Sequence, residues 1–130
     1  MKEYKETFTK TVKDENGLRH ILSSVRDVHS ASHGWYVGVA DITVMSNGDI
    51  KVDIPLIRSE SIGIYKEVFV KFVNNKQSVD YVLNEAKQTY KGSDGWSIDN
   101  PLLNNLPSGN TLVQIPLKRQ KAFIDNNKER

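Results

Sequence analysis

Three histidines are the side chains in this sequence whose types and spacing could bind a metal ion. His29 and His33 are four residues apart, and on a continuous helix that spacing places two imidazoles on one face. Ser30 and Gly34 indicate that the helix ends between the two histidines, and the sequence pattern places no third metal ligand beside them. The chain has no cysteine, which excludes disulfides, thiolate metal sites and a cysteine nucleophile. We therefore expect neither a metal site nor a cofactor.

The motifs of common enzyme classes are absent. A serine nucleophile needs a partnered base and an oxyanion site, and no G-x-S-x-G elbow occurs in the sequence. Neither G-x-G-x-x-G nor a Walker pattern is present to bind a nucleotide phosphate. We therefore expect a protein that is not an enzyme.

Basic side chains are concentrated in the second half of the chain. Residues 4–60 contain seven Lys/Arg against eight Asp/Glu, whereas residues 65–121 contain eight against five. The net charge of +2 does not by itself indicate nucleic acid, and a lysine-protected strand edge is the alternative explanation. The candidate nucleic-acid-binding residues are Arg58, Lys66, Lys71, Lys87, Lys91, Lys118, Arg119 and Lys121.

Two tryptophans follow a glycine at corresponding places in the two halves. If exposed, Trp35 and Trp96 could stack on bases or anchor a protein partner. If buried, each fills the gap where helix meets sheet, and this is the favoured alternative. Arg58 and Arg119 at the strand ends could likewise reach a phosphate or pair with a carboxylate.

The elements that must position these residues occur twice. Residues 4–12 (YKETFTKTV) and 65–73 (YKEVFVKFV) match at a displacement of 61 residues, which also aligns the Gly-Trp pairs and the two V-x-I-P-L-x-R segments. We infer a tandem duplication of residues 4–60 and 65–121. Each unit of about 57 residues would bury too little apolar surface alone. We therefore expect one domain over residues 1–130, with a short polar C-terminal tail.

Hydrophobic periodicity predicts a β-α-β-β unit. Apolar spacing predicts a helix over residues 15–30 and a second helix closed by Gly92, and residues 36–45 read as one continuous strand. In the second half the corresponding residues 97–106 contain Pro101 and predict a loop. Threonines at positions 7, 9 and 11 are replaced by Val68, Val70 and Phe72, so we expect the later strand to be central and buried.

These patterns predict an α+β fold. We expect a mostly antiparallel sheet with two helices packed on it, and a pseudo-two-fold axis that relates the two halves as in an internal dimer. The protein would then be either a monomer or a homodimer. No apolar run approaches the roughly 20 residues of a membrane span, and the N-terminus has no apolar signal region, so we expect a cytoplasmic protein without membrane contact.

Two functions are compatible with the sequence. The first is a small nucleic-acid-binding accessory protein that uses the basic second half, because a two-fold protein suits duplex DNA. The alternative is a protein-binding module, such as an inhibitor or assembly factor, that docks through a sheet edge or through the 97–106 loop. Leu102 and Leu103 are the candidate partner contacts in that loop.

Overall fold

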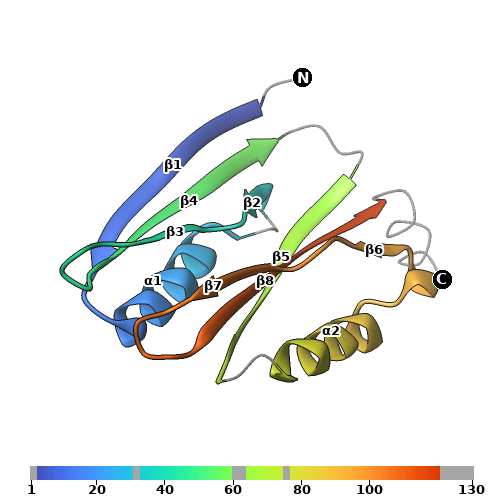
Figure 1. The fold of residues 1–130 in the computed structure, drawn as a ribbon. Coiled ribbons are helices and arrows are strands. Elements are labelled where there is room, and N and C mark those ends of the chain that lie inside the picture. Colours follow the sequence, from blue (N-terminus) through green and yellow to red (C-terminus); the bar gives the residue numbers. More distant parts are fainter. Residues whose placement is uncertain (1–2, 31–32, 60–63, 75–76, 121–130) are drawn as a thin grey trace.

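The first half of the chain contains four strands and one helix. A computed structural model of the protein describes residues 3–30, 33–59, 64–74 and 77–120 (Figure 1). In chain order the elements of this half are β1 (Glu3–Val12), α1 (Glu15–Val28), β2 (Trp35–Val37), β3 (Asp41–Val44) and β4 (Ile50–Ser59).

The second half has strands and helix in the same order. These elements are β5 (Ile64–Val73), α2 (Gln77–Thr89), the short 3-10 helix η2 (Gly92–Asp94), β6 (Trp96–Ile98), β7 (Leu102–Asn105) and β8 (Thr111–Gln120). The predicted α+β class is confirmed by two antiparallel four-stranded sheets and two helices. The strands divide between two sheets, one in each half, rather than forming one.

The two sheets have the same strand order and the same registers. The central strand β4 pairs with β1 on one side and with β2 and β3 on the other, and β8 pairs in the same way with β5, β6 and β7. Phe8 pairs with Ile54 in the first sheet, and Phe69 pairs with Ile115 in the second. A displacement of 61 residues therefore relates both the sequence and the pairing, although the duplication itself stays an inference from the sequence.

Helix α1 begins where the sequence predicts and ends two residues earlier. The Asp14 carboxylate caps its first turn by accepting a hydrogen bond from the Gly17 N–H at 2.9 Å. The predicted apolar stripe is buried at Leu18, Leu22 and Val25. The helix therefore presents this stripe to the sheet of its own half.

A proline in each central strand interrupts the neighbouring edge strand. Pro55 in β4 has no N–H to donate, and its carbonyl instead accepts a hydrogen bond from the Gly38 N–H at 2.9 Å. The Asp99 N–H donates to the Pro116 carbonyl in the second half, also at 2.9 Å. Regular pairing stops at these points, so each edge is built from two short strands.

This shared interruption corrects two expectations. Residues 36–45 do not form a continuous strand, because β2 and β3 are separate. Residues 97–106 are not a loop, because they contain the end of β6 and all of β7. The second half therefore contains strands that its weaker β propensity had argued against.

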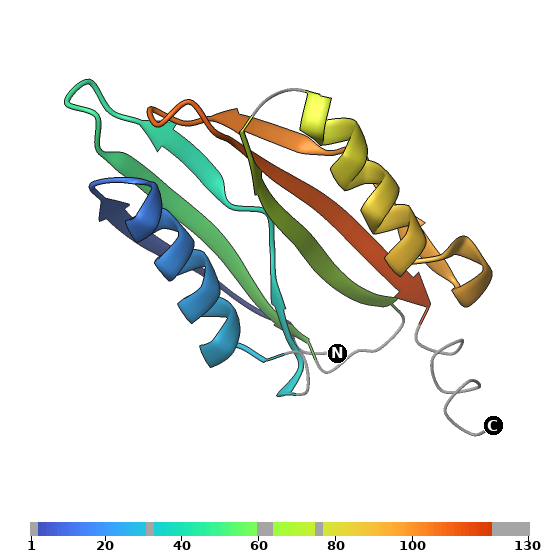
Figure 2. The same cartoon turned by 90° about the horizontal axis from the view of Figure 1, so that it is seen from below.

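The two halves have nearly the same orientation. Figures 1 and 2 show β4 and β8 running in nearly the same direction, with each helix on the same side of its own sheet. A two-fold axis would either reverse one strand or place the helices on opposite sides. The expected pseudo-two-fold relation is therefore replaced by a displacement of one half relative to the other.

The second half completes the core of the first half. A buried cluster around α1 and β4 includes Leu106 and Leu112 of the second half, and Val70 and Phe72 of β5 pack against it. The described members of the other buried cluster all belong to the second half. The second half thus contributes side chains to the core of the first half, and no described residue of the first half belongs to the core cluster of the second.

Strand β5 differs from its counterpart β1 in what covers it. Val68 is buried and Val70 and Phe72 pack on the first half, whereas Thr7, Thr9 and Thr11 are exposed. The apolar face of β5 is therefore covered, as expected. Its predicted central position is wrong, because β5 is at the edge of its sheet.

Candidate functional site

A buried glutamine joins the two halves. Gln114 in β8 is 1% exposed, and its amide binds the backbone of Ala40 between β2 and β3. The Ala40 N–H donates to Oε1 at 2.7 Å, and Nε2 donates to the Ala40 carbonyl at 2.9 Å. The counterparts Asp53 and Pro101 cannot repeat this contact, because Asp53 accepts from Thr9 and Pro101 has no N–H. The interface is therefore not reciprocal.

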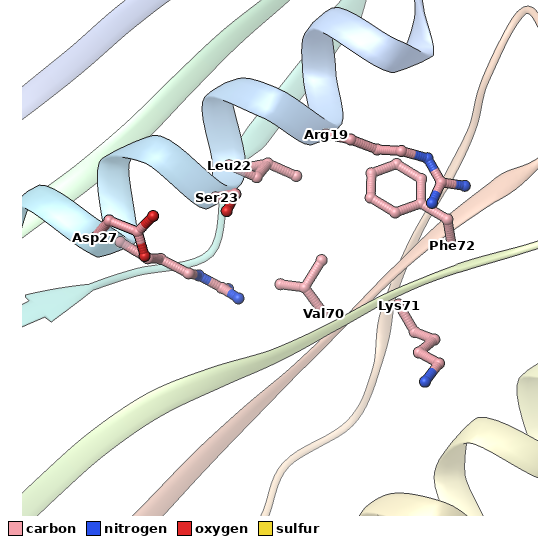
Figure 3. A pocket seen from close by; sticks show the side chains of 8 residues that line it. Arg19, Leu22, Ser23, Asp27, Val70, Lys71 and Phe72 are labelled. Carbon is pink, nitrogen blue, oxygen red and sulfur yellow. The ribbon is translucent and has the colours of Figure 1, made fainter.

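Helix α1 packs beside β5 along a groove of about 360 Å³. Figure 3 shows Arg19 and Leu22 of α1 opposite Val70 and Phe72 of β5, whereas Lys71 points away from α1. The Arg19 guanidinium lies 4.1 Å from the centroid of the Phe72 ring. The apolar face of strand β5 thus packs against the first half beside α1.

Glu15 forms a second polar contact between the halves. Its carboxylate accepts hydrogen bonds from Ser108 Oγ at 2.6 Å and from Asn110 Nδ2 at 3.0 Å, and it pairs with Arg19 at 2.8 Å. Burial raises the pKa of Glu15, but the hydrogen bonds from Ser108, Arg19 and Asn110 outweigh it and leave that pKa below its ordinary value. The ionised carboxylate is therefore favoured at this contact.

In the first half, β5 packs on the side formed by α1 and the β2–β3 edge. The corresponding side of the second half is uncovered. No described element packs on it in the way that β5 packs on α1. We call this surface the open flank. Its members are Leu83 of α2, Pro101, and Leu103 of β7, which correspond to Leu22, Ala40 and Ile42 of the first half.

Exposure separates the two sides. Leu22 is 6% exposed and Ala40 is 3% exposed, whereas Leu83 and Pro101 are only half-buried. Leu103 is 51% exposed, although its counterpart is half-buried against the first core. The open flank therefore retains apolar side chains of the kind that the first half buries.

The predicted partner residues lie at the edge of the second sheet. Leu102 and Leu103 belong to strand β7, so their expected position in a loop is wrong. Leu102 shares a face with Gln114, and Leu103 shares the opposite face with Val113. Leu102 is 46% exposed, so this edge strand presents an exposed leucine on each face.

The predicted basic residues are not gathered on one surface. Lys71 lies on the face toward α2, where its Nζ is 3.3 Å from Glu85. Lys87 and Lys91 are exposed at the end of α2 and after it, and Lys121 lies outside the described residues. The structure brings together Lys66 and Lys118, which are directly opposite each other on β5 and β8.

These two lysines are part of a row that crosses four strands. Ser97 of β6 is opposite Lys118, and the Lys66 Nζ lies 5.8 Å from the centroid of the Tyr36 ring of β2. We call Ser97, Lys118, Lys66 and Tyr36 the basic row. It lines an open groove of about 550 Å³, with Asp99 as an acidic neighbour.

Arg26 adds positive charge beside this row. Burial lowers its pKa, and the neighbouring Glu67, Tyr90 and Tyr36 partly oppose that shift. Burial also raises the pKa of Tyr36, an effect that the Arg26 charge reduces. The Tyr36 phenol therefore stays protonated near neutral pH and can donate a hydrogen bond.

Both tryptophans pack against the cores. Trp35 makes an edge contact with His29 at 4.8 Å between ring centroids, and Trp96 makes one with Tyr90, also at 4.8 Å. Each ring is half-buried. The packing agrees with the favoured core role.

The two arginines occupy matching positions beside these rings. Arg58 Nε donates to the His33 carbonyl at 3.2 Å, and Arg119 Nε donates to the Asp94 carbonyl at 2.8 Å. Each guanidinium lies within 6 Å of its tryptophan ring, at 5.9 Å and 5.5 Å. These hydrogen bonds connect the segments that precede β2 and β6 to the central strands β4 and β8.

The histidines do not meet as metal ligands. His29 Nδ1 lies 2.8 Å from the Val25 carbonyl at the end of α1, and His33 Nδ1 lies 2.7 Å from Ser30 Oγ. No group of three or more His, Asp or Glu side chains that could hold a metal ion occurs in the described part of the chain.

No known protein family, curated protein or solved structure matches this chain. None of the helices in the described ranges is long and apolar enough to cross a membrane. Because nothing matches the chain, the candidate sites are argued from their geometry alone.

Sequence reasoning did not identify Gln114 or Ser97. Gln114 is a polar residue within the apolar strand segment LVQIPL, and that contrast was a usable signal. Ser97 and Tyr36 carried no comparable signal, because their place in the basic row depends on registers between strands far apart in sequence.

Proposed function

We propose that this protein is a non-enzymatic binding module that recognises another protein through the open flank of its second half. One observation carries the proposal: the equivalent side of the first half is covered by an apolar strand face, whereas Leu83, Pro101 and Leu103 are not. Uncovered apolar side chains at a sheet edge are typical of interaction surfaces. The absence of cysteine fits a reducing cytoplasmic setting.

The first half indicates what kind of partner the open flank accepts. In that half, α1 receives the apolar face of strand β5. Strand β7 is an edge strand whose leucines point to both faces, so an extended partner segment added beside it would contact both. We therefore propose a partner that presents a strand with one apolar face.

The test compares capture of a partner from lysate by matched variants. Leu102→Ser with Leu103→Ser should abolish capture and leave the melting temperature within a few degrees, because both side chains are about half exposed. Val44→Ser with Met45→Ser removes similarly exposed apolar side chains from the first half and should leave capture unchanged. Equal capture by both double variants would refute the open flank as the binding surface.

Nucleic-acid binding is the second candidate function. The basic row favours it, because two lysines and an aromatic ring lie side by side at a groove. The other predicted basic residues that the structure describes lie on separate surfaces, and the two-fold match to duplex DNA is lost with the two-fold axis. Any such binding would therefore be centred on Lys66 and Lys118.

A further inference from the structure

Two lysines directly opposite each other in a ladder need an explanation. Lys66 and Lys118 are register partners, and paired side chains in an antiparallel sheet project to the same face. Like charges directly opposite each other destabilise a sheet. The first half avoids the repulsion, because the corresponding pair is Lys5 and Ile57.

The described part of the chain supplies neither lysine with an ion pair. The contact of Lys66 is with the Tyr36 ring, and the side chain of Lys118 is exposed. Asp99, the acidic residue that lines the groove, accepts a hydrogen bond from the Asn100 N–H at 3.0 Å. Both exposed ammonium groups are therefore accessible to an anionic ligand.

We propose that the basic row binds the phosphate group of an anionic ligand. Opposite side chains in a ladder are about 5 Å apart at Cβ, so one phosphate can accept from both ammonium groups. Ser97 is the next residue across the ladder and supplies a hydroxyl donor, and Tyr36 supplies a phenol at the other end. A groove of about 550 Å³ holds a phosphate together with part of a larger molecule.

The site deepens the second candidate function and rests on it only in part. A phosphodiester of nucleic acid and the phosphate of a small metabolite present the same oxygens to the basic row. The proposal therefore names the phosphate group, and the experiment distinguishes its sources.

Titration with inorganic phosphate at constant ionic strength tests the site directly. Amide resonances of Tyr36, Lys66, Ser97 and Lys118 should shift and saturate in nuclear magnetic resonance spectra, and chloride should not reproduce the shifts. Lys118→Ile recreates the neutral pair of the first half and should weaken binding about tenfold or more, because a charge-assisted hydrogen bond is lost. Lys13→Ile removes the same charge from an exposed position outside the groove and should leave binding unchanged.

Thermal melting supplies an independent readout. Phosphate should raise the melting temperature of the wild type more than that of Lys118→Ile, whose melting temperature without phosphate should be at least that of the wild type. Absent or non-saturable shifts, or equal affinity in Lys118→Ile, would overturn the proposal.

A short single-stranded oligonucleotide and a nucleoside monophosphate complete the experiment. Phosphate binding without oligonucleotide binding supports the site and rejects the nucleic-acid function. Oligonucleotide binding that weakens with salt and with Lys118→Ile supports both. Oligonucleotide binding that Lys118→Ile leaves unchanged keeps the function and rejects this site.

Discussion

A buried side-chain amide at the junction of the halves binds backbone groups that are shielded from water. Gln114 satisfies both the N–H and the carbonyl of Ala40 in a buried place. A buried backbone group without a partner costs about 1–3 kcal/mol, so this single amide fixes where the first half sits on β8. The same contact explains why a polar residue is retained at that position of an apolar strand.

Replacing this amide with an isosteric apolar group should destabilise the protein. Gln114→Leu leaves two backbone groups of Ala40 unpaired, and we expect the free energy of unfolding to fall by about 2–4 kcal/mol. Urea denaturation measures the change. Asp53→Leu at the counterpart position removes a half-buried carboxylate that bonds Thr9, and its effect should stay below about 1 kcal/mol. Equal losses would show that Gln114 is not a special contact.

At the residue scale the sequence identified the types of the important side chains better than their neighbours. Lys66, Lys118, Leu102 and Leu103 were all singled out from their chemistry. That Lys66 and Lys118 face each other could not be predicted, because a one-residue change of register moves a side chain to the other face of a sheet.

At the scale of elements, β1 and β5 show how one strand pattern serves two surroundings. Both strands lie at sheet edges, but the apolar face of β5 packs on the first half and the threonine face of β1 meets solvent. The exposed threonines give β1 a polar face, and charged side chains protect an edge strand from unwanted pairing. The strand with threonines, β1, is therefore the exposed one, and the strand with Val and Phe at the same positions, β5, is the covered one.

Exchanging single residues between these strands should have opposite consequences. Val68→Thr places a hydroxyl in a site that is 6% exposed, and it should lower the free energy of unfolding by about 1–3 kcal/mol. Thr7→Val changes an exposed position and should have an effect within about 0.5 kcal/mol. Chemical denaturation of the two variants tests the contrast, and a large loss for Thr7→Val would show that the β1 face is also packed.

Element types were predictable from periodicity, and the interruptions of the edge strands were not. The apolar stripes at the i, i+3 and i+4 positions correctly predicted α1 and α2. The break between β2 and β3 depends on Pro55 of a different strand, so it could be found only once the pairing was known. The loop that Pro101 predicted is wrong for the same reason, because Pro101 lies in a break that both halves share.

At the scale of the whole molecule, the two halves associate head to tail. Different residues of each half form the interface, and such heterologous contacts leave one unused surface at each end. At one end the unused surface is the open flank. At the other end it is the threonine face of β1, which has the place that Val68, Val70 and Phe72 have in β5.

This asymmetry disfavours polymerisation of the chain. Stacking a second copy would place the threonines of β1 against the open flank, where their hydroxyls would be buried without apolar contact. Pro101 also lacks the N–H through which Ala40 binds Gln114. We therefore predict that the wild-type protein is a monomer and that the open flank is kept for a different partner.

Sedimentation of one variant tests this central claim most directly. Thr7→Val, Thr9→Val and Thr11→Phe give β1 the apolar face of β5, and each buried side chain contributes about 1.5–3 kcal/mol before the entropy of association. We predict concentration-dependent head-to-tail oligomers of this triple variant in analytical ultracentrifugation. Adding Leu103→Ser should restore the monomer, whereas adding Val44→Ser should not. A triple variant that stays monomeric, or oligomers that persist with Leu103→Ser, would contradict the open flank as a docking surface.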